Sequence, residues 1–420
     1  MTTAAGATPA PPREVRAALS ASFISLLGDQ VARLAMTVLV LQRTHSAALS
    51  ALAYALTMVP AAVGGPLLGG LADRFPRRRV MVAADLARAL LVVVPALPGC
   101  PLAIGFTAIA LIACVEAGFD ASRAALVADL AGPRYLAVLG WDRVVNQSAQ
   151  LLGFAVGGMV LVAVGARGGL ALDAGTFLAS ALLLTRVRAR PAPIGRRTDG
   201  VVRTAVSDAI AGARHVLQDA ARRRPLALAV VIAAAAVLPE GLAAAYAREL
   251  HRGGGTAAVL MLANPAGAVA SALWLARRTA PERRPLAWIA VATGPLLLLA
   301  AGPPLPVVVA LLIVSGAGMS ASLILRAHFT AAVDPALRGR AFAFAGTMLT
   351  VTQGAAVALG GLTAQALGSV HLTLAGTGAA ALAICLGLSR ASRRREGDEP
   401  VAHAQRHRLE LRMRTQLGEH

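Results

Sequence analysis

The 420-residue chain contains no lysine, only three cysteines and few charged residues. Charged residues make up 15% of the sequence and hydrophobic residues 57%, whereas a soluble domain has about 25% charged residues. The cysteines, Cys100, Cys114 and Cys385, are too few and too scattered to indicate a disulfide framework or a metal site. We therefore expect no metal and no cofactor. A chain this apolar must expose its surface to lipid, so we predict a membrane protein.

Long, unbroken apolar runs predict that the membrane-spanning elements are helices. Backbone polar groups inside a bilayer must be satisfied within the protein, which leaves helices and closed barrels. Barrel strands would alternate polar and apolar residues, and no such alternation is seen here. A spanning helix needs about 20 predominantly apolar residues. The sequence offers twelve such segments, at 19–42, 47–71, 79–97, 102–119, 145–165, 168–186, 226–247, 256–276, 285–301, 304–325, 341–366 and 370–389.

The distribution of arginine predicts the orientation of these spans. All 40 basic residues are arginine, and with the N-terminus inside, 34 of them fall on the inner side. The outer loops hold only Arg43, Arg167, Arg248 and Arg252. Because cytoplasmic loops are enriched in arginine and lysine, we expect a multi-pass protein of the plasma membrane with both termini in the cytoplasm. The net charge of +19 then reflects topology, and we expect no nucleic-acid partner because the arginines are not grouped in one domain.

The predicted fold is an all-α membrane protein with two pseudo-symmetric six-helix bundles. Apolar residues at helical spacing between the bundles indicate an amphipathic helix on the inner membrane surface. Similar elements at matching positions, Met58-Val59-Pro60 and Ala263-Asn264-Pro265, are typical of halves related by duplication. The expected parts are a flexible tail, a first bundle, a basic linker, a second bundle and a basic tail, at 1–18, 19–186, 187–225, 226–389 and 390–420.

The loop after the second span reads Gly-Gly-Leu-Ala-Asp-Arg-Phe-Pro-Arg-Arg-Arg over 69–79. It resembles the signature loop of the major facilitator superfamily, Gly-x-x-x-Asp-Arg-x-Gly-Arg-Arg, with Pro76 in place of the second glycine. Other stretches resemble the branch that includes the enterobactin exporter and multidrug and macrolide efflux proteins: Gly28-Asp29, Arg88, Leu172-Asp173-Ala174 and Leu337-Arg338-Gly339-Arg340. The residues that match the signature are Gly69, Asp73, Arg74, Arg77 and Arg78.

The resemblance implies a secondary transporter whose signature loop takes part in gating. Asp73 can pair with an arginine or meet the positive N-terminus of another helix, and such contacts would hold the bundles together in the outward-open state. Candidate partners are Arg123 and the start of span 11 near Gly339 and Arg340. The alternative is that the loop is only a positive anchor on the inner side, which would not account for Asp73.

Three glycines in span 5, Gly153, Gly157 and Gly158, resemble the Gly-Pro-x-x-Gly-Gly element of antiporters of the superfamily, with Phe154 at the proline position. Glycines allow close approach of helix backbones. A small-residue packing face without any antiporter meaning is the alternative interpretation.

Ionisable residues within spans are costly and are typical of ion or substrate pathways. Asp29 lies deep in span 1, and Arg33 is one turn away and within reach of a pair. Glu116 and Glu240 are further isolated acids, and the resemblance implies that spans 1, 4, 7 and 10 line a central cavity. We expect Asp29, Arg33, Glu116 and Glu240 to form the proton or substrate pathway. The alternative is a structural Asp29–Arg33 pair, and a structural role is also expected for the Asp85–Arg88 pair and for Asp173.

The sequence contains no nucleotide-binding loop, no zinc-ligand spacing and no Gly-x-Ser-x-Gly element, so neither an enzyme nor an ATP-driven pump is expected. We predict a monomeric, proton-coupled exporter of small amphipathic compounds such as drugs, natural products or siderophores. An importer or uniporter of a small metabolite is one alternative. A transport-inactive membrane sensor or scaffold is the other.

The predicted topology can be tested with fusions to alkaline phosphatase, which is active outside the cytoplasm, and to a fluorescent protein, which folds inside. Outside signals are expected after Arg43, Arg167 and Arg252, and inside signals after Arg79, Arg197 and Arg284. An inside signal after Arg252 would contradict the division into two six-helix halves.

Overall fold

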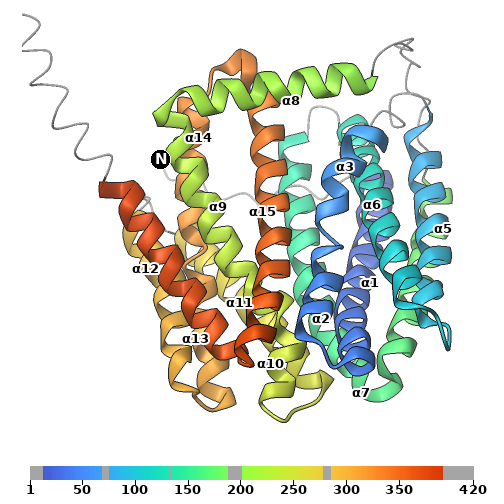
Figure 1. Ribbon diagram of the computed structural model, residues 1–420. Helices are drawn as coiled ribbons and strands as arrows, with labels where there is room; N and C mark the ends of the chain where they lie inside the picture. Colours follow the sequence, from blue (N-terminus) through green and yellow to red (C-terminus); the bar gives the residue numbers. More distant parts are fainter. Residues whose placement is uncertain (1–12, 69–74, 132–134, 188–200, 278–284, 391–420) are drawn as a thin grey trace, which may run out of the picture.

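The computed structural model describes residues 13–68, 75–131, 135–187, 201–277 and 285–390 (Figure 1). Regular structure in these ranges is helical, without strands, which confirms the all-α prediction. The first half contains α1 (Arg13–Thr44), α2 (Ala47–Ala55), α3 (Val59–Leu68), α5 (Arg77–Ala96), α6 (Leu102–Ala131) and α7 (Tyr135–Thr185). The second half contains α9 (Ala220–Gly241), α10 (Ala243–Glu249), α11 (Gly254–Ala276), α12 (Pro285–Leu298), α13 (Leu305–Ala317), α14 (Ser320–Ala332), α15 (Arg338–Leu367) and a last helix, Val370–Arg390.

The twelve expected spans fall on described helices, except that the end of the second span, 69–71, lies outside the described residues and that spans 5 and 6 share α7. Gly165, with φ of 72°, divides α7 into two spans. The expected boundaries are wrong between spans 4 and 5, where α6 continues to Ala131 and α7 begins at Tyr135. Hydropathy marks only the apolar part of a helix. These two helices continue beyond it as polar segments that carry Asp–Arg pairs such as Arg123–Asp142.

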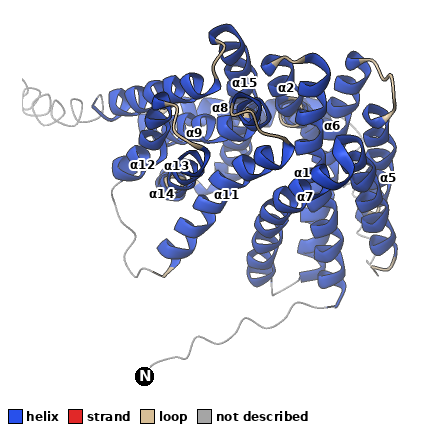
Figure 2. Ribbon diagram, turned by 90° about the horizontal axis from the view of Figure 1, so that it is seen from below, coloured by secondary structure: helices blue, strands red, loops and turns tan. Residues whose placement is uncertain are grey.

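Helix α8 (Val201–Gln218) lies in the linker between the halves and runs across one end of the molecule, over the ends of α14, α9 and α15 (Figure 1). We call this end the linker side. The opposite end, where α1 turns into α2 and α10 turns into α11, is called the far side. Viewed from the far side, α1, α5, α6 and α7 lie to one side of the molecule and α9 and α12–α14 to the other (Figure 2).

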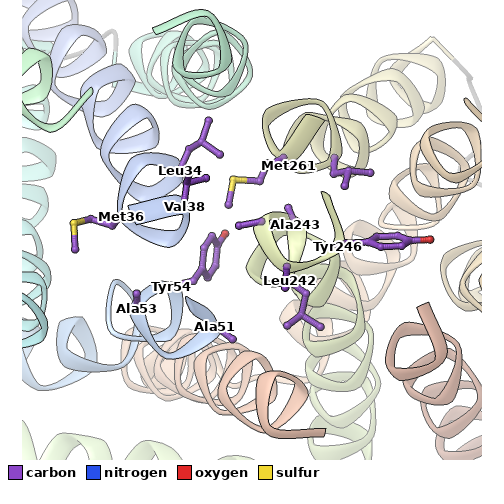
Figure 3. Packing of buried hydrophobic residues seen from close by; sticks show 14 of the residues in the cluster. Leu34, Met36, Val38, Ala51, Ala53, Tyr54, Leu242, Ala243, Tyr246 and Met261 are labelled. Carbon is purple, nitrogen blue, oxygen red and sulfur yellow. The ribbon is translucent and has the colours of Figure 1, made fainter. Parts of the chain in front are cut away.

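The two halves share one continuous apolar core near the far side. Buried residues from α1 and α2 pack in the same cluster as residues from α9, α10 and α11. Figure 3 shows Tyr54 next to Leu34 and Val38 of its own half and near Ala243 and Met261 of the other half. Because this cluster crosses the boundary between the halves, the far side of the structure is closed by packed side chains.

Glycines bring helices of the two halves close together at this closure. A Cβ on Gly158 of α7 would lie 2.5 Å from the Cβ of Ala258 on α11. A Cβ on Gly361 of α15 would lie 2.4 Å from the Cβ of Ala51 on α2. Any side chain at either glycine would therefore push the halves apart.

Hydrogen bonds near the chain turns add to this closure. The Ser46 hydroxyl donates to Oε1 of Gln365 at 2.5 Å. The Arg248 guanidinium donates to the carbonyl oxygen of His45 at 3.1 Å. Both bonds join one half of the molecule to the other at its far side.

The other two glycines of span 5 pack within the first half. A Cβ on Gly153 would lie 2.6 Å from the Cβ of Gln30 and 2.8 Å from the carbonyl oxygen of Leu27, both on α1. A Cβ on Gly157 would lie 3.2 Å from a methyl carbon of Leu34. These two glycines thus set the distance between α7 and α1, which carries Asp29 and Arg33.

We expect Gly153→Ala to destabilise the protein by about 1–3 kcal/mol, because an added methyl group would overpack the α1–α7 contact. Gly175→Ala is the matched control on the same helix, since a Cβ at Gly175 meets nothing within 4 Å. Thermal unfolding of the purified protein in detergent measures both. Equal unfolding temperatures for the two variants would contradict this account of the α1–α7 contact.

Candidate functional site

Arg88 is the centre of a buried ion cluster inside the first half. Its side chain is 1% exposed and donates to Oδ2 of Asp29 at 3.3 Å and to Oδ1 of Asp85 at 2.5 Å. The Ser25 hydroxyl lies 3.0 Å from the same guanidinium and 3.3 Å from Asp85. The expected local Asp85–Arg88 pair is present, but it is one part of a cluster that joins α5 to α1.

The alternative of a structural Asp29–Arg33 pair is contradicted by the ion pairs that both residues form. Helical spacing places the two residues one turn apart, but each of them has a partner on another helix. Asp29 binds Arg88 of α5, and Arg33 binds Glu116 of α6 at 3.3 Å. Side chains from two other helices therefore replace the local pair, Arg88 of α5 at Asp29 and Glu116 of α6 at Arg33.

Two aromatic rings complete the surroundings of Arg88. The guanidinium carbon lies 4.4 Å from the ring centre of Phe119 on α6 and 4.4 Å from that of Phe177 on α7. A cation between ring faces is stabilised by the ring quadrupoles, and the more so when it is desolvated. The positive charge in this cluster is thus compensated by two carboxylates and two rings, which gives Arg88 a single well-defined position.

A second polar cluster crosses the boundary between the halves. The Tyr54 hydroxyl on α2 donates to Oε2 of Glu240 on α9 at 2.9 Å. Arg33 interacts electrostatically with Tyr54 and Glu240 in addition to its pair with Glu116. Three of the predicted pathway residues, Arg33, Glu116 and Glu240, therefore lie in one neighbourhood. Tyr54 is not among the residues predicted from the sequence, where its only signal is an isolated phenol within an apolar span.

A small cavity lies beside Asp29 of the first cluster and beside Arg33 and Glu116. Its volume is about 40 Å³, and its lining includes Asp29, Arg33, Glu116 and Asp173. A space of this size has room for about two or three water molecules. Because residues of both clusters line it, the cavity gives them a short polar connection within the first half.

Asp173, for which a structural role was expected, lines this cavity and is 1% exposed. Its Oδ1 accepts a hydrogen bond from the Thr176 hydroxyl at 3.0 Å. A Cβ on Gly28 would lie 2.2 Å from that oxygen, so the glycine before Asp29 makes room for Asp173. The two aspartates are thus brought to the same cavity by close packing of α1 and α7.

Carboxyl groups outnumber guanidinium groups in these clusters. The acids are Asp29, Asp85, Glu116, Asp173 and Glu240, and the bases are Arg33 and Arg88. An unpaired charge is costly in an apolar interior. The excess carboxyl groups can therefore be neutralised in two ways, by protons or by a cationic group that enters the site.

Part of the predicted gating loop, Gly69, Asp73 and Arg74, lies outside the described residues. Arg77 is bound by Asp129 and by the carbonyl oxygen of Ala125, the latter at 2.8 Å. Arg78 donates to the carbonyl oxygen of Val187 at 2.8 Å, just after the end of α7. A cation near a helix C-terminus interacts favourably with the helix dipole, so both arginines join α5 to neighbouring helices of the first half.

The suggested partners of Asp73 have contacts of their own. Arg123 lies 3.3 Å from Asp120 and 2.5 Å from Asp142, which joins the polar ends of α6 and α7. A Cβ on Gly212 of α8 would lie 2.4 Å from the carbonyl oxygen of Arg340, so the start of α15 packs against the linker helix. At Gly339, by contrast, a Cβ would meet nothing within 4 Å.

Comparisons with known proteins agree with this architecture. The family model described as Major Facilitator Superfamily matches residues 18–292. A POT family transporter in complex with a thioalcohol-conjugated peptide superposes with a TM-score of 0.71 at 11% identity, covering 91% of this chain and 96% of that one. No curated protein sequence matches the chain.

Two further solved structures share the fold. The nucleoside transporter NupG has a TM-score of 0.70 at 15% identity, covering 90% of this chain and 99% of its own. A bacterial homologue of the human lysosomal transporter Spinster, in an inward-facing and unoccupied conformation, has a TM-score of 0.69 at 15% identity and covers 90% and 97%. At these identities the similarity shows the fold.

We expect Arg88→Gln to destabilise the protein by about 3–5 kcal/mol, because it leaves two buried carboxyl groups without their cation. Arg88→Lys should recover only part of this loss, since an ammonium group cannot bridge both carboxylates and fill the space between two rings. Arg33→Gln is the control. The Arg33 and Glu116 side chains are 19% and 15% exposed, so loss of their ion pair should destabilise the protein less. Thermal unfolding in detergent measures all three, and an unchanged midpoint for Arg88→Gln would disprove the central position of Arg88.

Proposed function

The chain belongs to the Major Facilitator Superfamily and is a multi-pass membrane transporter, and we propose that it exports small amphipathic compounds, such as drugs, natural products or siderophores, in exchange for protons. We further propose that it works as a monomer in the plasma membrane. The excess of arginine on the linker side favours a cytoplasmic position for that side and for both termini.

The observation that carries the proposal is the excess of carboxyl groups around the cavity next to Arg33. Each carboxyl group without a guanidinium partner needs a proton or a substrate cation to be neutral. A proton and a cationic substrate can therefore replace one another at the same group. This exchange is the chemical requirement for export driven by a proton gradient. The sequence contains no nucleotide-binding loop, so a gradient is the proposed energy source.

Asp29 is the proposed proton carrier because opposing forces act on it. Burial favours the neutral form of a carboxyl group, and a nearby guanidinium favours the charged form. Asp29 is 5% exposed and lies 3.3 Å from Arg88, so both forces act there. A change in hydration of the adjacent cavity during transport would shift the balance, which gives the proton affinity of Asp29 a dependence on conformation.

Glu240 is the proposed link between proton binding and the movement of the halves. Its hydrogen bond to Tyr54 crosses the boundary between the halves, so the bond must break when the far side opens. A buried acceptor that loses its donor is destabilised, and protonation of Glu240 would relieve this cost. Glu116 and Arg33 would complete the pathway between Glu240 and Asp29.

The signature loop is the proposed gate on the linker side. Arg77, Arg78 and Arg123 hold the polar helix ends of the first half together. Asp73, with Arg74 and Gly69, would then contact the start of α15 near Gly339 and Arg340 when the linker side closes. Because α8 already packs against that start, the linker helix would move together with the second half.

We expect Asp29→Asn to abolish uphill export while leaving substrate binding or downhill exchange. The amide keeps the size of the side chain but carries no exchangeable carboxyl proton. The first measurement is uptake of a lipophilic cationic dye into inside-out reconstituted vesicles, with and without an imposed proton gradient. The second is the proton flux that the dye induces in the same vesicles. Asp334→Asn, on an exposed turn, is the matched control and should transport like the parent.

Uphill transport by Asp29→Asn with the proton flux of the parent would make Asp29 structural, and Glu240 or Glu116 would become the candidate carrier. If no compound in a panel of dyes and antibiotics is exported by the parent, but a metabolite is accumulated by cells that express it, the direction proposed here is wrong and the protein is an importer.

A further inference from the structure

A pocket of about 210 Å³ lies on the far side, at the boundary between the two halves. The first half contributes Gln42 and His45 from the end of α1. The second half contributes Arg248, Arg252, Gly253 and Gly254 from the turn between α10 and α11. Apolar residues such as Val38 and Ala257 form the rest of the lining.

The positive charge of this pocket is unusual for its position. Only four arginines fall in the expected outer loops, and two of them line this one pocket. Arg248 donates to the carbonyl oxygen of His45 at 3.1 Å, which does not neutralise its charge. Within the described residues, the Arg252 guanidinium has no hydrogen bond and no ion pair.

No carboxylate among the described residues lines the pocket. The acid next in sequence, Glu249, accepts a hydrogen bond from the backbone N–H of Val370 and pairs with the His371 ring. Those contacts hold it at the start of the last helix. Two arginines, both exposed, therefore line one pocket that has no carboxylate among its described lining residues.

The start of α11 adds backbone donors to the same pocket. The first N–H groups of a helix have no partner within the helix, and they favour anions. The residue before α11 is Gly253, which provides no side-chain cap, and a Cβ there would meet nothing within 4 Å. An oxyanion can thus approach the backbone at Gly253 and Gly254 while it contacts the arginines.

We propose that this pocket binds a small oxyanion of the phosphate class, supplied either as the free ion or as the headgroup of an anionic phospholipid. Charge-assisted hydrogen bonds from Arg248 and Arg252 and the backbone donors of α11 would hold it. Neither guanidinium reaches the buried carboxyl clusters of the proposed transport pathway, so the site is separate from that pathway.

Residues of both halves form the site, so binding of the anion depends on how the halves are positioned. Opening of the far side would separate Gln42 and His45 from Arg248 and Arg252 and would dismantle the pocket. A ligand that binds one of two states shifts the equilibrium toward that state. The bound oxyanion therefore stabilises the closed far side, and outside phosphate or lipid would slow the opening of the transporter.

The test uses the full chain, purified and placed in nanodiscs of zwitterionic lipid, with inorganic phosphate titrated against chloride at constant ionic strength. Phosphate should raise the unfolding temperature of the parent protein in a saturable way. Arg252→Gln should weaken phosphate binding about tenfold, as expected for the loss of one charge-assisted contact. Arg167→Gln, another arginine of the expected outer loops that does not line the pocket, should bind phosphate like the parent.

A cross-link tests whether the site belongs to the closed state. Ser46 and Gln365 are 2.5 Å apart at their side-chain oxygens and do not line the pocket. Ser46→Cys with Gln365→Cys, in a background without the three native cysteines, should be bridged by a short, reducible bifunctional thiol reagent, which locks the far side. Phosphate binding to the locked protein should be at least as tight as to its reduced form, and weaker binding on locking would overturn the proposal.

The lipid composition distinguishes the two sources of the anion. If anionic phospholipid in the nanodisc stabilises the parent but not Arg252→Gln, and removes the response to phosphate, the bound group is a lipid headgroup. If phosphate still acts in the presence of that lipid, the bound group is the free ion. The proposal fails if neither stabilises the parent, or if Arg167→Gln and Arg252→Gln weaken binding equally. Failure here would leave the proton-coupled export untouched, since that is measured by dye uptake.

Discussion

The exclusion of water from the middle of the membrane is the constraint on which the rest of this structure depends. It requires that backbone groups be satisfied within helices, and it makes each ionisable side chain in a span costly unless it has a partner. Arg88 meets this requirement most completely, with two aspartates and two aromatic rings around one guanidinium. The cluster joins three helices of the first half to α1 and so positions Asp29 beside the cavity.

The two polar clusters differ in what they can do during transport. The Arg88 cluster lies wholly within one half, so it moves as part of that half and its contacts persist. The Tyr54–Glu240 hydrogen bond joins the halves, so it can be present only in states in which the far side is closed. In the proposed mechanism, the cavity lined by Asp29, Arg33 and Glu116 would connect the permanent cluster to the conditional one.

The closure of the far side rests on small residues as well as on polar contacts. Gly158 and Gly361 allow backbones of opposite halves to approach closely, and the arginines near the α10–α11 turn meet the end of α1 at the pocket. Packing by small residues has no strong directional preference, so this part of the interface can separate without breaking hydrogen bonds, whereas the Tyr54–Glu240 bond must break. A bound anion would add a further directional contact to the hydrogen bonds that already join the halves there.

The sequence by itself determined the class of protein, the twelve spans, the signature loop and the identity of the buried acids, because composition, hydropathy and charge report directly on the contact with lipid. Only the tertiary structure decided the partners. Helical spacing made Arg33 the natural partner of Asp29, yet Asp29 binds Arg88 and Arg33 binds Glu116. Tyr54 and Asp173 joined the site although the sequence analysis gave neither of them a place in the pathway. The spacing of residues along one helix shows which side chains share a face, but the helix that packs against that face, and the group it presents there, depends on how the whole bundle is packed.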